Sequence, residues 1–166
     1  VDAVTGETLA GLDNPGKLGA VAWSPDGRHL AMISAADRND PLEGRLLVAP
    51  AAGGPLRDLL PSYEGHVAAI GWQDADTVMY VGDEGVWTTF NRVELDGSNQ
   101  KAIFATGGPI FTAFSLAGDG MSAAFVGESA QHPQEVFVMK HGESASRRLS
   151  DSNPWLSARR LAPQEV

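Results

Sequence analysis

Ala22-Trp23-Ser24-Pro25-Asp26-Gly27-Arg28-His29-Leu30-Ala31-Met32 is the stretch that decides the fold of this chain. It reads as the end of an apolar strand, a tight turn and a second apolar strand. Pro25 sits where a turn requires a φ of roughly −65°, and Gly27 sits where a positive φ is tolerated. The stretch therefore predicts an antiparallel hairpin.

Weaker copies of this hairpin follow at residues 71–80 and 113–125. The third strand expected in each unit ends at Ala49, Leu95 and Lys140, which are 46 and 45 residues apart. This spacing is typical of the roughly 40–50 residues per blade in β-propellers. The chain is thus predicted to be all-β, built from four-stranded antiparallel blades.

The expected strands follow from turn residues and apolar runs within each unit. They are Ala20 to Trp23, His29 to Ser34, Arg45 to Ala49 and Pro55 to Leu60; Val67 to Trp72, Thr77 to Val81, Val86 to Leu95 and Lys101 to Ala105; Ile110 to Ser115, Ser122 to Gly127, Glu135 to Lys140 and Ser146 to Leu149.

About three blades are therefore expected in residues 1–150, at about residues 19–60, 61–106 and 107–150. Residues 1–18 hold a remnant: Val4 to Leu12 reads as a turn and the outermost strand of a blade that is otherwise missing. Closed rings usually contain roughly four to eight blades. We accordingly expect an incomplete ring, whose cut faces expose strands such as Phe111 to Leu116 and Ala123 to Val126 and cause self-association.

Composition excludes several classes of function. Twelve basic residues stand against 21 acidic ones, a net charge of −9, which argues against a nucleic-acid partner. No cysteine is present, so disulfides and sulfur-based metal sites are excluded, while the compartment, cytoplasmic or periplasmic, stays open. No apolar run approaches the roughly 20 residues of a membrane span. The start lacks an initiator Met and a signal pattern, so we expect the chain to begin inside a longer protein.

The strand-turn-strand unit resembles the propeller repeats of the prolyl oligopeptidase family of serine peptidases, and also those of periplasmic scaffold proteins. The tail favours the former. Arg148-Leu149-Ser150, Asn153-Pro154 and Gln164-Glu165-Val166 resemble the connection to the α/β-hydrolase domain in bacterial dipeptidyl-peptidase-like and acylaminoacyl-peptidase-like members. The resemblance implies that residues 151–166 are a linker toward such a domain, and that these are the last blades of a propeller of about seven or eight.

On this resemblance the chain is a non-catalytic propeller segment that gates or caps the active site of a peptidase cleaving short peptides. Its partners would be the hydrolase domain of the same parent chain and a peptide passing through the ring, and the Ser-Asp-His triad would lie outside these residues. The alternative is a propeller scaffold or protein-binding module with no catalytic domain. Sugar recognition has no clustered pair of exposed aromatic residues to support it.

No catalytic, cofactor or metal residue is expected in this chain, and substrate-binding residues are undetermined. Residues 127–131 and 142–146 begin like the Gly-x-Ser-x-Gly of a hydrolase at Ser129 and Ser144, but both lack the closing Gly and are interpreted as turns. The four histidines show no i, i+4 pair typical of a helical metal site, and we interpret them as exposed or packing residues: His29, His66, His132 and His141.

Acidic residues recur between the second and third strands: Asp37, Asp40, Glu43, Asp83, Glu84 and Glu128. Because strands alternate in direction, these loops should share one face of the disc with the blade-to-blade links, including Tyr63, Glu64 and His66. Such a face can attract the amino terminus of a peptide. A solvated loop face is the favoured interpretation.

Aromatic residues are interpreted as structural. Trp23, Trp72 and Phe114 are expected at the same place in each unit, packed between blades. Trp87 lies in a strand predicted to have one buried and one solvent-facing side. Trp155 is expected to anchor the linker onto the last blade.

Overall fold

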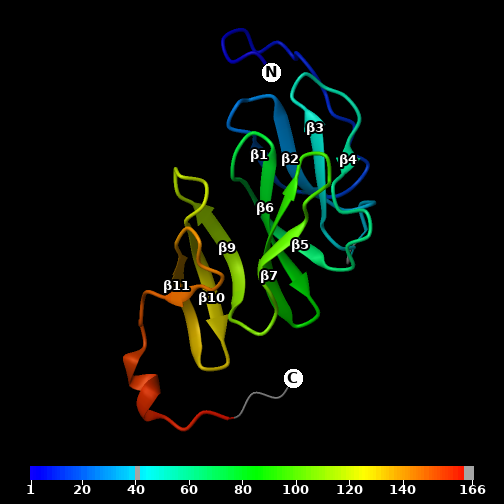
Figure 1. Ribbon diagram of the computed structural model, residues 1–166. Coiled ribbons are helices and arrows are strands. Elements are labelled where there is room, and N and C mark those ends of the chain that lie inside the picture. The colour runs from blue at the N-terminus through cyan, green and yellow to red at the C-terminus, as the bar shows by residue number, and fades with distance from the viewer. Residues whose placement is uncertain (40–41, 163–166) are drawn as a thin grey trace.

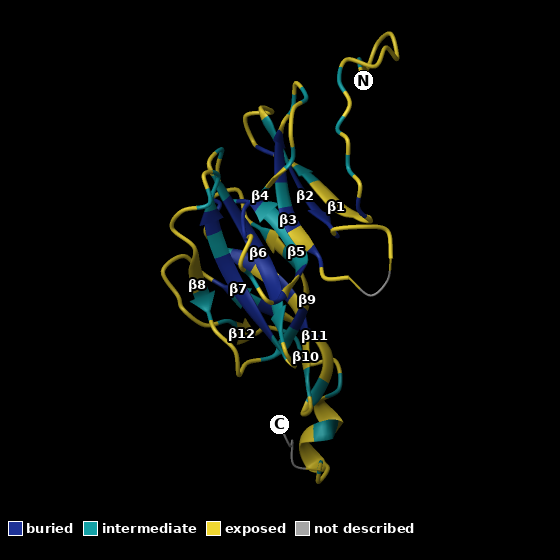
Figure 2. Cartoon of the chain, turned by 90° about the vertical axis from the view of Figure 1, so that its right-hand side faces the viewer, coloured by how far each residue is buried: buried dark blue, intermediate teal, exposed yellow. Residues whose placement is uncertain are grey.

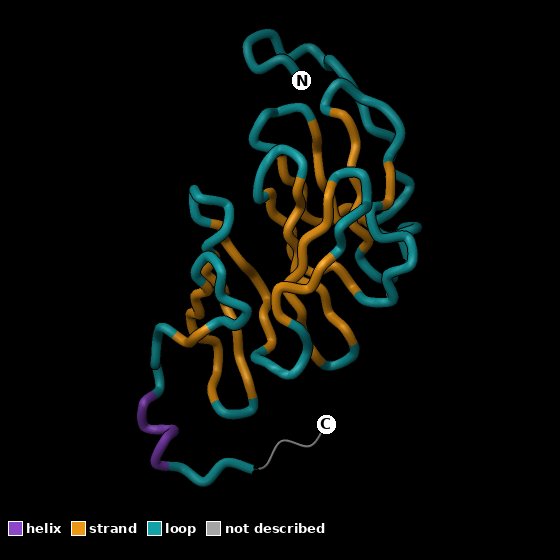
Figure 3. Tube along the Cα trace, in the orientation of Figure 1, coloured by secondary structure: helices purple, strands orange, loops and turns teal. Residues whose placement is uncertain are grey.

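The computed structural model describes residues 1–39 and 42–162 and confirms the all-β architecture. Three four-stranded antiparallel sheets follow one another in chain order, and no sheet closes on itself (Figures 1 and 3). Blade 1 contains β1 (Leu18–Trp23), β2 (His29–Ser34), β3 (Arg45–Pro50) and β4 (Arg57–Asp58). Blade 2 contains β5 (His66–Trp72), β6 (Thr77–Glu84), β7 (Trp87–Glu94) and β8 (Lys101–Phe104). Blade 3 contains β9 (Ile110–Leu116), β10 (Ala123–Ser129), β11 (His132–Met139) and β12 (Arg147–Arg148).

Each of the twelve expected strands overlaps one of these strands. In the part of the chain that the structure describes, the one helical segment is the 3-10 helix η1 (Pro154–Ala158). It is too short and too polar to cross a membrane, and no other described helix could do so.

Hydrogen bonds in the turn between the first and second strands show which residues are equivalent in the three blades. In the first hairpin Ser24 N–H donates to the His29 carbonyl (2.9 Å). In blade 3 the matching bond runs from Ala117 N–H to the Ser122 carbonyl (2.8 Å). Leu116 is therefore the equivalent of Trp23 and Trp72, and the placement of Phe114 at that position was wrong by two residues. The error arose because alternate residues of a strand share a face: Phe114, two positions before Leu116, gives the same apolar pattern in the sequence.

The hydrophobic cores lie between blades. Blades 1 and 2 enclose a cluster that includes Leu46, Val78 and the indole of Trp72, whose Nε1–H donates to the Ala22 carbonyl (3.0 Å). Blades 2 and 3 enclose a second cluster dominated by phenylalanine rings. Their centroids lie between 4.9 and 5.4 Å apart for the pairs Phe90–Phe104, Phe90–Phe125, Phe104–Phe111 and Phe111–Phe125. Face-to-face contact of neighbouring blades thus supplies most of the buried apolar area.

Blade 2 has a neighbour on each side, and this changes the expected pattern of β7. Thr88 and Thr89 are both buried, at 3% and 2% exposure, and Phe90 is buried as well. The prediction of one solvent-facing side was wrong, because alternation in exposure requires one free face and this strand has none (Figure 2).

The outer faces of blades 1 and 3 are the open ends of the assembly. Trp23 is 60% exposed, whereas its equivalent Trp72 is 9% exposed, so the expected packing of Trp23 between blades was wrong: no blade covers it. On blade 3, Val126 and Val136 are 37% and 41% exposed, although their equivalents in the other blades are buried.

The cut face of blade 3 follows alternate residues rather than whole strands. Phe111 is 2% exposed, because it points into the core shared with blade 2, so its predicted exposure was wrong. Ala113 and Ser115, on the opposite side of β9, are exposed together with Ala124 of β10.

The segment before β1 contains the predicted turn, but the outermost strand expected within Val4 to Leu12 does not form. Gly6 N–H donates to the Asp2 carbonyl (2.9 Å) and closes the predicted turn. Farther on, Ala10 lies beside Gly53, and Asn14 Oδ1 accepts the Ser34 hydroxyl (2.8 Å). The described residues contain no third strand for this segment to pair with, so its backbone passes over blade 1 without a ladder.

We predict that Phe125→Ala lowers the free energy of unfolding by about 3–5 kcal/mol, because it leaves a cavity among four rings. Val126→Ala, one residue farther on the open face, is the matched control and should cost less than about 1 kcal/mol. Urea unfolding followed by circular dichroism measures both. Equal costs would contradict the assignment of the core to the interface between blades.

Candidate functional site

Connections gather on two opposite faces because successive strands alternate in direction. The linker face carries the β6–β7 and β10–β11 turns, the links between blades, and residues 149–162 that follow β12. Figure 1 shows the β10–β11 turn and the linker at the same, lower end of the molecule. The other face, here the turn face, carries the β1–β2, β5–β6 and β9–β10 turns.

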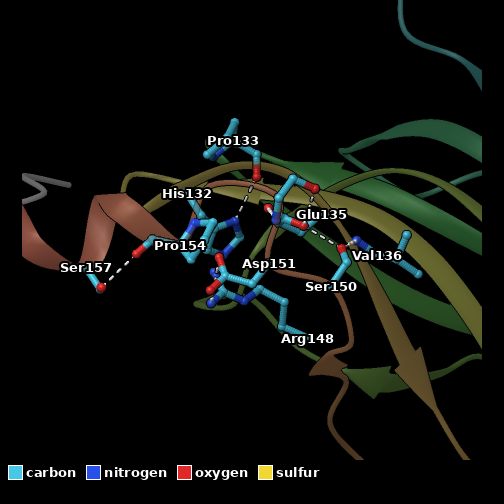
Figure 4. Close-up of polar contacts among 10 residues, drawn as sticks. His132, Pro133, Glu135, Val136, Arg148, Ser150, Asp151, Pro154 and Ser157 are labelled. Carbon is cyan, nitrogen blue, oxygen red and sulfur yellow. Dashed lines mark hydrogen bonds and ion pairs between the residues drawn. The ribbon is translucent and has the colours of Figure 1, made fainter.

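A buried carboxylate holds the start of the linker. Glu135 of β11 is 3% exposed, and its carboxylate accepts the Ser150 hydroxyl, the Ser152 N–H (2.7 Å) and the Ser152 hydroxyl (3.1 Å). The Ser150 oxygen in turn accepts the Val136 N–H (2.9 Å), and Figure 4 shows this arrangement. We call these four residues the clasp.

The clasp favours the charged form of Glu135. Hydrogen bonds from the Ser150 hydroxyl and from Ser152 lower the pKa of Glu135 below its ordinary value, and the positive charge of Arg148 acts in the same direction. This residue was not predicted from the sequence. The available signal was a glutamate at a core-facing position of β11, in phase with Phe137 and Met139.

Beyond the clasp the linker turns through η1. Trp155 is 58% exposed, and the Arg159 guanidinium lies 6.0 Å from its ring centroid. The prediction that Trp155 anchors the linker on blade 3 was therefore wrong. Leu156 and Leu161 instead face the blades.

Between the linker and the blades lies a concave region of about 740 Å³, the linker groove. Blade 2 contributes Trp87, the first residue of β7, and blade 3 contributes Glu128 and His132 from either side of the β10–β11 turn. Leu156 and Leu161 close the third side. The groove brings together an aromatic ring, an exposed carboxylate and an imidazole.

The serines singled out in the sequence lie in turns. Ser129 Oγ accepts the Gln131 N–H (3.0 Å), and His132, opposite it in the ladder, has Nδ1 2.9 Å from the Pro133 carbonyl. Across the described ranges no side-chain hydrogen bond joins Ser129 to His132. Ser144 is exposed in the β11–β12 turn.

Two other histidines have structural surroundings. His66, the first residue of β5, accepts the Gly44 N–H at Nδ1 (2.7 Å) and so ties blade 1 to blade 2. His29 lies in β2 with a buried Nδ1 that has no hydrogen-bond partner. His141 is exposed in the β11–β12 turn.

The acidic residues of the linker face are only partly free. Glu84 accepts the Tyr63 hydroxyl (3.1 Å) and the Thr89 hydroxyl (3.0 Å), and Glu43 pairs with Arg45 (3.6 Å). Burial, together with the charge of Glu84, raises the pKa of Tyr63 well above its ordinary range.

The remaining acidic residues differ in their surroundings. Burial raises the pKa of Asp83. Asp37 caps its own loop through the Asn39 N–H (2.7 Å), and Glu128 is exposed in the linker groove. Asp40 lies outside the described residues. Within residues 1–39 and 42–162 no group of three or more His, Asp or Glu side chains is arranged to hold a metal ion.

Comparison with known proteins supports the fold. No protein-family model matches the sequence, and no curated protein sequence is significantly similar to it. Among solved structures, a puromycin-hydrolyzing peptidase of Mycobacterium tuberculosis is similar over 82% of this chain and 22% of that one, with 19% identity and a TM-score of 0.66. The β-propeller domain of the trilobed protease from Pyrococcus furiosus is similar over 78% of this chain and 39% of that one, with 17% identity and a TM-score of 0.58.

TolB from Acinetobacter baumannii is also similar, over 80% of this chain and 32% of that one, with 14% identity and a TM-score of 0.60. The chain thus spans less than half the length of each of these three proteins. At such identities the likeness shows the β-propeller fold, and the chain is a partial propeller.

We predict that Glu135→Gln speeds amide hydrogen exchange at Ser152 about tenfold at pH 7, because a neutral amide accepts hydrogen bonds more weakly than a carboxylate. Glu128→Gln, on the neighbouring strand, is the control and should leave that exchange unchanged. Because folding lowers the pKa of Glu135, the clasp stabilises the chain above the ordinary Glu pKa of roughly 4.3. That stabilisation should be lost as the pH falls through the lower folded value. Slow exchange retained in the variant would show that the clasp does not hold the linker.

Proposed function

We propose that this chain is the C-terminal part of the non-catalytic propeller of a serine peptidase of the prolyl oligopeptidase family. Residues 1–150 are then a remnant and three late blades, and residues 151–166 lead toward an α/β-hydrolase domain. The supporting observation is the clasp, which fixes the exit of the linker on the face that also carries the linker groove. A domain following this linker would be held over that face.

The mechanism proposed for the propeller is exclusion by size. A ring of blades above a hydrolase active site admits short, extended peptides and keeps folded proteins out. The linker groove, with Trp87, Glu128 and His132, would contact peptides at the boundary between the two domains. Acyl transfer through a Ser-Asp-His triad would take place outside these residues, since neither Ser129 nor Ser144 has a nucleophile's surroundings.

The finer assignment rests on the tail. Arg148-Leu149-Ser150 and Asn153-Pro154 fall in β12, the clasp and the start of η1, and Gln164-Glu165-Val166 lies outside the described residues. The resemblance of these segments favours a bacterial dipeptidyl-peptidase-like or acylaminoacyl-peptidase-like parent.

The second candidate is a propeller scaffold that binds a protein partner and has no catalytic domain. The similarity to TolB and the acidic linker face fit this function equally well. The two candidates differ in whether a hydrolase domain is joined to the linker in the parent protein.

We predict that the coding DNA downstream of Val166 specifies Gly-x-Ser-x-Gly on a strand-to-helix turn, then an Asp and then a His. Sequencing the DNA on both sides of this segment makes the test. A stop codon directly after Val166, or further blades in place of a hydrolase, would refute the peptidase and leave the scaffold.

We also propose that the chain alone self-associates through its open blade faces. Val126→Asp on blade 3 should then reduce association at high concentration, because it places a charge on an apolar sheet face. Val86→Asp, in the exposed β6–β7 turn, is the control and should have little effect. Light scattering coupled to size exclusion measures both, and a monomeric unmodified chain at high concentration would contradict the proposal.

A further inference from the structure

A cleft of about 570 Å³ opens between blades 2 and 3 toward the turn face, away from the linker groove. Arg92 of β7 and Lys101 of β8 form its blade 2 wall, and the β11–β12 turn contributes His141 and Glu143 from blade 3. Met79 and Met139 lie between these walls. Three basic side chains therefore line one cleft in a chain with 12 Lys and Arg residues against 21 acidic ones.

Comparison among the three blades shows that Arg92 is the exception. The equivalent positions are Val48 in blade 1 and Val138 in blade 3, as the strand registers establish. Each has a basic residue opposite it on the outermost strand: Arg57 faces Val48, Lys101 faces Arg92, and Arg147 faces Val138. Valine satisfies the packing at this position twice, so packing does not account for the arginine.

The arginine brings an electrostatic cost with it. Arg92 and Lys101 are direct cross-strand partners and point to the same side of the sheet, where like charges destabilise the pairing. Arg92 Nε is buried and has no hydrogen-bond partner. In residues 1–39 and 42–162, no ion pair involves Arg92 or Lys101.

The acidic residue of the cleft, Glu143, does not balance the charges of Arg92 and Lys101. The Glu143 carboxylate accepts the Lys140 N–H through Oε2 (2.8 Å) and is thereby held by its own turn. Buried donors in native proteins are nearly always satisfied, so the free Arg92 Nε–H requires an explanation. Two adjacent cations with a buried free N–H favour a negative charge beside them.

We propose that the cleft binds an oxyanion, the carboxylate or phosphate group of a small molecule, between Arg92 and Lys101. A guanidinium presents N–H groups in a plane that matches two oxygens of such an anion, and an ammonium adds a compact charge beside it. His141 is placed to donate from the opposite wall. This site is independent of the proposed peptidase function, since it needs neither the linker nor a catalytic domain.

The test is thermal unfolding of the chain with sodium phosphate, sodium acetate or sodium chloride at matched ionic strength. Phosphate, acetate or both should raise the melting temperature more than chloride does, because a ligand that binds only the folded state stabilises it. A rise with phosphate alone identifies a phosphate site, and a rise with acetate identifies a carboxylate site. Equal melting temperatures in all three salts would overturn the proposal.

The decisive variant is Arg92→Val, which installs the residue found in the other two blades. It should unfold at a higher temperature than the unmodified chain in chloride and yet weaken anion binding at least about tenfold. Arg147→Gln, the equivalent of Lys101 in blade 3, is the matched control and should keep the full anion response. Glu143→Gln should strengthen binding by removing a negative charge from the cleft. An Arg92→Val chain with an undiminished anion response would show that exclusion of phosphate or acetate from the protein surface, and no site, is responsible.

Discussion

Packing of one blade against the next is the interaction on which this structure depends. A four-stranded sheet has two faces, and in this chain each buried face is buried by a neighbouring sheet. Blade 2, with a neighbour on each side, is buried on both faces, whereas Trp23 and Val126 are exposed to solvent on the outer blades. The three copies of the repeat therefore have different surroundings. Whether a residue of a blade is buried depends on the neighbouring blades as well as on the sequence of that blade.

This dependence explains which features could be predicted. Turn residues and apolar runs are local, so Ser24-Pro25-Asp26-Gly27, its weaker copies and the other turn and apolar segments of each unit placed every strand of the three blades. Burial is not local. The double burial of Thr88 and Thr89, and the exposure of Trp23, follow from the number of neighbouring blades, which no single strand encodes. Glu135 was missed for a related reason: its partners lie 15 and 17 residues away in a segment without regular structure.

The chemistry of the chain is divided between its two faces. On the linker face, the buried carboxylate of Glu135 accepts hydrogen bonds from the Ser152 N–H and from the hydroxyls of Ser150 and Ser152, which sets the direction in which the chain leaves blade 3. In the part of the chain that the structure describes, Arg92 and Lys101 on the turn face have no ion-pair partner, and Arg92 Nε has no hydrogen-bond partner. The charge of Glu135 is thus balanced by hydrogen bonds within the fold, whereas the charges of Arg92 and Lys101 are not.

The contact of Trp72 with Ala22, and of Phe114 with Gly71, pairs a large ring on one blade with a small residue on the blade before it. Neither member of such a pair can change size alone, because the ring fills the space that the small residue leaves. Selection therefore acts on the junction between two units rather than on either unit. When such a chain grows by duplication, a copied blade carries only half of each junction, and compensating substitutions must arise in its new neighbours before the copy can be retained.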